Sequence, residues 1–173
     1  METEEEIPEF GIKRDNEERR DGGCGIVFDP KTQLYAVSKE TSNGKLRLFA
    51  GGVDENEDIE KGVLREVTEE SGLHDFLHVE KIGTVFAHYR NTLRNVNRIT
   101  KSTCFLIILN NTSLVDVKLE EHEKFALHWA TLEEIYSNWE NRNENKDYEH
   151  LFYFFKKTIP RIKELGYDTT NKI

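Results

Sequence analysis

Hydrophobic residues in the first third of the chain form short runs typical of β-strands. Turn residues such as Asp, Pro, Asn and Gly separate three such runs, which cover residues 24–28, 33–38 and 46–50. The pattern predicts strands joined by tight turns, and Gly51-Gly52 is expected to break the third strand. Two more β-rich runs, residues 79–88 and 102–109, are separated by a polar, basic connection.

Hydrophobic residues at helical spacing predict helices in mid-chain and near the end. An acidic loop over residues 54–58 precedes a predicted helix over 59–71, for which Gly72 is a natural C-terminal residue. After a short strand at 126–130, Thr131-Leu132-Glu133-Glu134 matches a capping box that opens a second helix to about Trp139. Residues 147–165 predict a final helix, interrupted or bent near Pro160.

These strands and helices predict an α/β fold, a sandwich with a mixed β-sheet; strand order cannot be inferred from the pattern. Residues 1–21 are dense in charge and poor in apolar side chains, so a mobile tail or a lightly docked arm is expected there. Structure is expected to begin near Gly22, and residues 22–173 are interpreted as a single domain. Removal of residues 1–20 is accordingly expected to leave activity nearly unchanged.

Charge and cysteine content exclude some classes of protein. The 173 residues carry a formal net charge of −9, which argues against binding to duplex nucleic acid, since that needs a basic surface. The two cysteines, Cys24 and Cys104, lie in apolar runs and are interpreted as buried free thiols in a reducing compartment. No secretory signal or membrane-spanning run is seen, so a cytoplasmic protein without a membrane partner is expected.

The segment GGVDENEDIEKGVLREVTEESGL, residues 51–73, carries the chemistry. At about 100° per residue, Glu66, Glu69 and Glu70 lie within an arc of roughly 100° on the predicted helix. Val63, Leu64 and Val67 occupy a neighbouring arc that can face the core. Like charges so close destabilise a helix, and a hard divalent cation bound through carboxylate oxygens would compensate. A solvated acidic helix face is the alternative.

The same segment resembles the Nudix box, G-x5-E-x7-R-E-U-x-E-E-x-G-U with U an aliphatic residue, at every specified position. The two residues before the box depart from relatives that have Leu-Pro-Gly-Gly, since this chain has Leu48-Phe49-Ala50-Gly51. The resemblance implies an α/β/α sandwich and catalytic roles for five residues: Glu57, Arg65, Glu66, Glu69 and Glu70. It implies that Arg65 pairs with Glu57. It also implies Mg²⁺, with Mn²⁺ as an expected substitute, held by Glu66, Glu69, Glu70 and the carbonyl of Ala50.

Further site residues are expected outside the box. Nudix relatives often place an acidic ligand or base shortly before a strand like the one around Trp129. Glu120, Glu121 and Glu123 are therefore candidates, Glu121 being the one assigned to the metal, with a solvated turn as the alternative.

The position of Tyr89, sixteen residues after Leu73, resembles that in Nudix enzymes acting on dinucleoside polyphosphates, although an aromatic at a strand end explains it equally well. With Arg90 and Arg94 it is predicted to bind substrate, in a segment made basic also by Arg98 and Lys101. The alternative for these cations is a solvated loop.

The resemblance implies a hydrolase that cleaves a phosphoanhydride bond in a nucleoside diphosphate linked to another moiety. A nucleoside triphosphate or a dinucleoside polyphosphate is the expected substrate. Because Nudix proteins are commonly dimers, a homodimer is one candidate assembly. The alternative is a Nudix-fold module that binds or senses nucleotides without turnover. Retention of every box carboxylate favours the enzyme.

Overall fold

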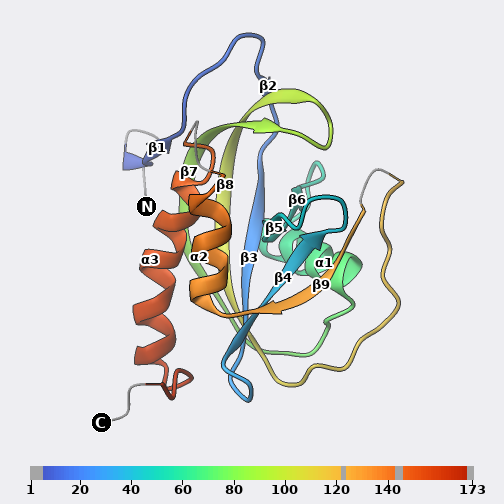
Figure 1. Ribbon diagram of the computed structural model, residues 1–173, viewed down its shortest axis with the longest axis vertical. Helices are drawn as coiled ribbons and strands as arrows, with labels where there is room; N and C mark the ends of the chain where they lie inside the picture. Colours follow the sequence, from blue (N-terminus) through green and yellow to red (C-terminus); the bar gives the residue numbers. More distant parts are fainter. Residues whose placement is uncertain (1–5, 122–123, 143–145, 171–173) are drawn as a thin grey trace.

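A mixed β-sheet with helices on both faces makes up the computed structural model, which describes residues 6–121, 124–142 and 146–170 (Figure 1). The predicted α/β sandwich with a mixed sheet is therefore confirmed. The elements, in chain order, are β1 (Glu9–Phe10), β2 (Glu18–Arg19), β3 (Gly22–Asp29), β4 (Leu34–Glu40), β5 (Leu46–Arg47), β6 (Phe49–Gly52), α1 (Ile59–Ser71), β7 (Phe76–Asn91), β8 (Val96–Leu109), β9 (Phe125–Ala130), α2 (Leu132–Glu140) and α3 (Glu149–Glu164).

Strand β3 is at the centre of the sheet. It pairs in parallel with β8 and antiparallel with β4 and β6. Along the main path the strand order is β1-β7-β8-β3-β4-β5, and β9 joins through β4. Because β3 is buried over its full length, its alternating side chains feed one apolar cluster on each face of the sheet.

The two clusters fix the helices to opposite faces (Figure 1). On one face, Val63 and Val67 of α1 pack against a cluster that includes Val27 and Ile107. Helices α2 and α3 pack on the other face, where their large side chains join Ile26, Phe28 and Leu106 of the sheet. The helix side chains in this cluster include Ile135, Trp139, Phe154, Phe155 and Ile162. The core-facing arc predicted for α1 is thus confirmed for Val63 and Val67, while Leu64 is partly buried against the same cluster.

The helix ends follow their local signals. Asp58 caps the first turn of α1 by accepting a hydrogen bond from the Lys61 N–H, and Gly72 ends the helix with φ of 84°. Thr131 caps α2 through the N–H of Glu134. The predicted bounds of α1 are confirmed. The predicted interruption near Pro160 is wrong, since α3 continues through that residue. Pro160 lies in the last turn and a half, where it costs one backbone hydrogen bond.

Two strand predictions need correction. Gly51 and Gly52 do not break the third strand: both belong to β6, paired with Gly23 and Gly22, and the break falls at Leu48 instead. The polar connection predicted between residues 88 and 102 is mostly sheet. Strands β7 and β8 form one long hairpin in which Tyr89 lies directly opposite Arg98. Cross-strand pairing supplies the order that a polar sequence does not signal.

The N-terminal arm, residues 6–21, is attached to the sheet, so structure begins well before Gly22. Strand β1 pairs in parallel with β7, and β2 pairs in parallel with β8. The carboxylate of Glu17 lies 2.8 Å from Nδ1 of the buried His88. The guanidinium of Arg14 bonds Asp147 at 2.9 Å. Backbone pairing and buried polar contacts hold most of the arm, and Phe10 adds an apolar contact with Tyr153 of α3. Because few apolar side chains take part, the composition suggested little structure.

Candidate active site

Helix α1 presents Glu66 to the edge of β6. With Val63 and Val67 in the core, the opposite arc of the helix carries the box carboxylates, of which Glu66 is 19% exposed. A Cβ at position 51 would lie 2.4 Å from the carboxyl carbon of Glu66. The Gly51 required by the box therefore lets the Glu66 carboxylate lie directly against the backbone of β6.

Arg65 links three carboxylates of the box. Its Nε and one terminal nitrogen bond the two oxygens of Glu57, at 2.9 and 3.1 Å. Its other terminal nitrogen bonds Glu66 at 3.0 Å and Glu69 at 3.2 Å. The Glu57 carboxylate also accepts a hydrogen bond from the N–H of Asp54, 3.1 Å away. The pairing of Arg65 with Glu57 is as predicted, and it fixes the loop before α1 to the helix.

These contacts keep Glu57 deprotonated and Arg65 protonated. The hydrogen bonds from Arg65, together with the N–H of Asp54, lower the pKa of Glu57. Hydrogen bonding to Glu57 raises the pKa of Arg65 in turn, aided by the neighbouring charge of Glu66. Both groups are therefore charged at neutral pH, and Arg65 holds the carboxylates of Glu66 and Glu69 on the same side of the helix.

Glu70 reaches the strand before the box. Its side chain is 6% exposed, and one of its oxygens accepts a hydrogen bond from the N–H of Ala50 at 3.1 Å. The bond joins the C-terminal part of α1 to β6 at the residue whose carbonyl was expected to bind metal. Glu66 and Glu70 thus both meet the backbone of β6, one at Gly51 and one at Ala50.

The oxygen donors of the box are of the chemical kind that binds a hard divalent cation. Carboxylates of Glu66, Glu69 and Glu70 and a backbone carbonyl are the ligands that Mg²⁺ prefers. Within the described residues, no three His, Cys, Asp or Glu side chains converge closely enough to hold a metal ion. The carboxylates are instead bonded to Arg65 and Ala50, so a cation would compete with these bonds for the same oxygens.

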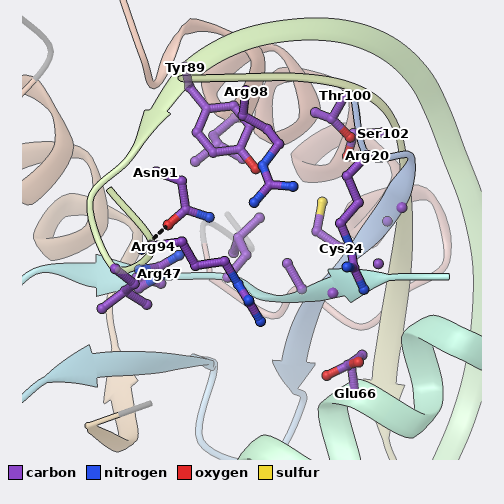
Figure 2. Close-up of a pocket in the computed structure, with 18 of the residues that line it drawn as sticks. Arg20, Cys24, Arg47, Glu66, Tyr89, Asn91, Arg94, Arg98, Thr100 and Ser102 are labelled. Atoms are coloured by element: carbon purple, nitrogen blue, oxygen red, sulfur yellow. Dashed lines mark hydrogen bonds between the residues drawn. The ribbon is translucent and has the colours of Figure 1, made fainter. Parts of the chain in front are cut away.

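A cavity of about 720 Å³ opens beside the box, bounded by β3, β6, the β7–β8 hairpin and the start of α3 (Figure 2). Glu66 and Glu69 border it on the α1 side. Among the described residues that line it, nine are Arg or Lys and five are Asp or Glu. The excess of positive charge contrasts with the net charge of −9 of the whole chain. Such a local field favours a polyanionic ligand.

The predicted substrate-binding residues line this cavity, but each has further contacts. Tyr89 packs one face of its ring on His150, with ring centroids 6.1 Å apart, so the aromatic is both a pocket wall and a packing residue. Arg90 bonds Asn97 at 3.1 Å and Asn95 within its own hairpin. The guanidinium of Arg94 bonds Glu120, 3.3 Å away, and both are exposed.

The acidic candidates after residue 119 are separated by the structure. Glu120 lines the cavity, whereas Glu121 is exposed and lies outside its lining. Glu123 lies outside the described residues. The placement favours Glu120 over Glu121 as the residue of this group nearest to the site.

Several arginines that line the cavity were not predicted as site residues, Arg98 and Arg20 among them. Arg98, which the sequence indicated only as part of a basic segment, is 7% exposed and points into the cavity (Figure 2). Arg20, assigned to the tail, lies across Gly52, where an added Cβ would be 2.1 Å from its Nε. The alternation of Arg98, Thr100 and Ser102 on β8 was a weak signal for Arg98. Nothing in the charged N-terminal sequence distinguished Arg20.

The fold and the box together define the class of domain, and comparison with known proteins identifies its family. The NUDIX domain family matches residues 18–152. This chain therefore belongs to the Nudix family. A relative, Nudix hydrolase 6 of Arabidopsis thaliana, is 28% identical over 165 residues, which are 91% of this chain and 54% of that protein. The chain thus spans about half the length of this relative.

Solved structures share the fold. The MutT protein of Methanosarcina mazei has a TM-score of 0.53 at 20% identity, covering 86% of this chain and 99% of its own. The NUDIX domain of NrtR from Shewanella oneidensis, solved with ADP-ribose, has a TM-score of 0.51 at 17% identity, covering 72% and 79%. Among the helices described, none is both long and apolar enough to cross a membrane.

Proposed function

We propose that this protein hydrolyses a phosphoanhydride bond in a nucleoside diphosphate linked to another moiety, with Mg²⁺ as cofactor and Mn²⁺ as substitute. Nucleoside triphosphates and dinucleoside polyphosphates are the first substrates to try. The box is complete, and the observation that carries the proposal is that its Arg65, Glu66 and Glu69 line one wall of a cavity with an excess of positive charge. Family membership supports the class of reaction, and the cavity supports an anionic substrate.

The box residues divide into holding and orienting groups. Glu66, Glu69 and Glu70 would hold the cation, together with the carbonyl of Ala50. Arg65 would orient two of these carboxylates through the bonds at 3.0 and 3.2 Å, with Glu57 fixing its position. When bound, the cation supplies Lewis acidity and lowers the pKa of water at the site.

The side chains of the cavity would position the substrate. Cationic groups facing the cavity attract phosphate oxygens and compensate the charge that the substrate brings. In the reaction, a water oxygen attacks one phosphorus while the bridging oxygen leaves with the other phosphate. The proton lost by that water passes to a carboxylate of the site. Tyr89 borders the space left for a base or a second moiety.

A panel of nucleotides assayed for phosphate release tests the proposal. Glu66→Gln should lose at least about two orders of magnitude in kcat, whereas Glu60→Gln, an exposed residue on the first turn of the same helix, should keep wild-type turnover. Equal activity of the two variants would refute the assignment. Tight nucleotide binding with no turnover by the wild type would instead favour the alternative, a nucleotide-binding module.

A further inference from the structure

Arg98 is a buried cation that the protein itself leaves uncompensated. Its side chain is 7% exposed, and its Nε is buried without a hydrogen-bond partner. Its guanidinium forms no hydrogen bond or ion pair with any of the residues that the structure describes. Glu18 lies beside it on β2, but that residue is exposed and, in the described part of the chain, no ion pair joins the two. Nε is removed from water while the rest of the guanidinium faces the cavity. A cation so placed is costly unless an anion meets it.

The geometry of β8 directs this cation toward the ligand. Arg98, Thr100 and Ser102 alternate along the strand and therefore share one face, and all three line the cavity. Tyr89 stands directly opposite Arg98 in the hairpin. Figure 2 shows the guanidinium of Arg98 directed into the cavity, on the other side of β6 from Glu66. Together, Ser102, Thr100 and Arg98 form one polar wall of the cavity that leads away from the box.

Along β8, the backbone of Arg98 lies apart from the box. Ser102 lies four positions after Arg98, about 13 Å along the strand. Ser102 in turn pairs with Gly22, and Gly22 with Gly52, next to the Gly51 that contacts Glu66. An anion bound by Arg98 is therefore distinct from the phosphates at the box.

We propose that Arg98 anchors a second phosphate group of the substrate, one separated from the anhydride that is cleaved. The inference rests on the proposed function and narrows its substrate class to nucleotides that carry such a phosphate. A guanidinium fork matches phosphate oxygens, and the Thr100 and Ser102 hydroxyls offer further donors along the same wall. Two sources supply this chemistry: a longer polyphosphate chain, or a phosphate ester on the nucleoside or on the moiety linked to it.

Matched ligand pairs that differ in phosphate content test the proposal and separate its two sources. Diadenosine tetraphosphate against diadenosine diphosphate tests the chain. ADP-ribose 2′-phosphate against ADP-ribose, and coenzyme A against its dephospho form, test the ester. For the wild type, kcat/KM is expected to be higher for the ligand with more phosphate groups, either in the chain-length pair or in the ester pairs. In Arg98→Gln that member should lose at least about 30-fold, mainly through KM, and the other member should change little.

Conservative and control variants exclude a general charge effect. Arg98→Lys keeps the charge without the fork and should recover part of the preference. Lys101→Gln removes one positive charge from the same strand, but its side chain does not line the cavity, so its preference should equal that of the wild type. In the ligand-free protein, Arg98→Gln should melt at or above the wild-type temperature, because an uncompensated buried charge is removed. A clear drop in melting temperature would show that Arg98 is structural.

Binding without turnover separates this inference from the proposed function. Calorimetric titration in EDTA measures the affinity of each pair member for the wild type and Arg98→Gln. An Arg98-dependent preference for the phosphate-richer member supports the second site even if no ligand is hydrolysed. Hydrolysis without such a preference in any pair would overturn the second site and leave the proposed function standing. A variant that changed base selectivity in place of phosphate selectivity would overturn it as well.

Discussion

His150 should make the protein less stable in mild acid. The imidazole is 9% exposed between Tyr89 and Phe154. Burial lowers its pKa from 6.5 to about 4. An unfolded chain binds the proton below pH 6.5, and the folded protein resists it until about pH 4. The neutral, buried His150 therefore costs the folded protein no stability above pH 6.5. Stability falls as the pH drops from 6.5 to about 4, because only the unfolded chain binds the proton there.

The size of the effect follows from the two pKa values. At about 1.4 kcal/mol per pKa unit, the difference between 6.5 and 4 lowers the free energy of unfolding by about 2 kcal/mol between pH 7 and pH 5. His150→Phe keeps a ring against Tyr89 and does not titrate. Its loss of stability over the same interval should be smaller than that of the wild type by this amount.

Urea denaturation at pH 7, 6 and 5 measures this difference directly. His74→Gln is the matched control, because His74 is exposed and its removal should leave the acid dependence of the wild type in place. An equal loss of stability from pH 7 to pH 5 in the wild type and His150→Phe would refute the reasoning. A weaker dependence in His74→Gln would indicate that an exposed histidine carries the effect instead.

Three further predictions concern activity. Glu70→Gln should lower kcat by at least about two orders of magnitude with the fold intact, because Gln can still accept the Ala50 N–H; kinetics with circular dichroism check both, and wild-type turnover would contradict the role. Removal of residues 2–20 should raise KM and lower the melting temperature, since the arm pairs with the sheet and brings Arg20 to the cavity. Unchanged kinetics would show that the arm is dispensable for activity. Tyr89→Ala should cost roughly 5- to 100-fold in kcat/KM through KM, the range for loss of base stacking; a fall in stability with KM unchanged would identify Tyr89 as a packing residue alone.

Local signals in the sequence were sufficient for the helices and the box. Gly72 and Thr131 act within one turn of their own helix, so their positions predicted the end of α1 and the start of α2. The pairing of Arg65 with Glu57 was also predicted, through the fixed spacing of the box. Such signals need no knowledge of strand order.

The cavity could not be predicted in the same way, because it depends on contacts between distant segments. The burial of Arg98 results from hairpin β7–β8 extending to Tyr89, a register that polar residues at its tip do not reveal. Arg20 reaches the site because β2 pairs with β8, some 80 residues away. Likewise, the sequence could not distinguish Glu120 from Glu121, since one residue decides which side chain faces the cavity.

Hydrolysis in ¹⁸O-labelled water, with the products separated and analysed by mass spectrometry, most directly tests whether the protein catalyses attack of water on a phosphoanhydride. With Mg²⁺ present, at least one nucleotide of the panel should yield two phosphate-containing products, with the label in one of them, at a rate that rises toward alkaline pH. Excess EDTA should abolish the reaction, and Glu70→Gln should reduce it to near background. Full turnover in EDTA, or unlabelled phosphate products, would contradict metal-dependent attack of water on a phosphoanhydride.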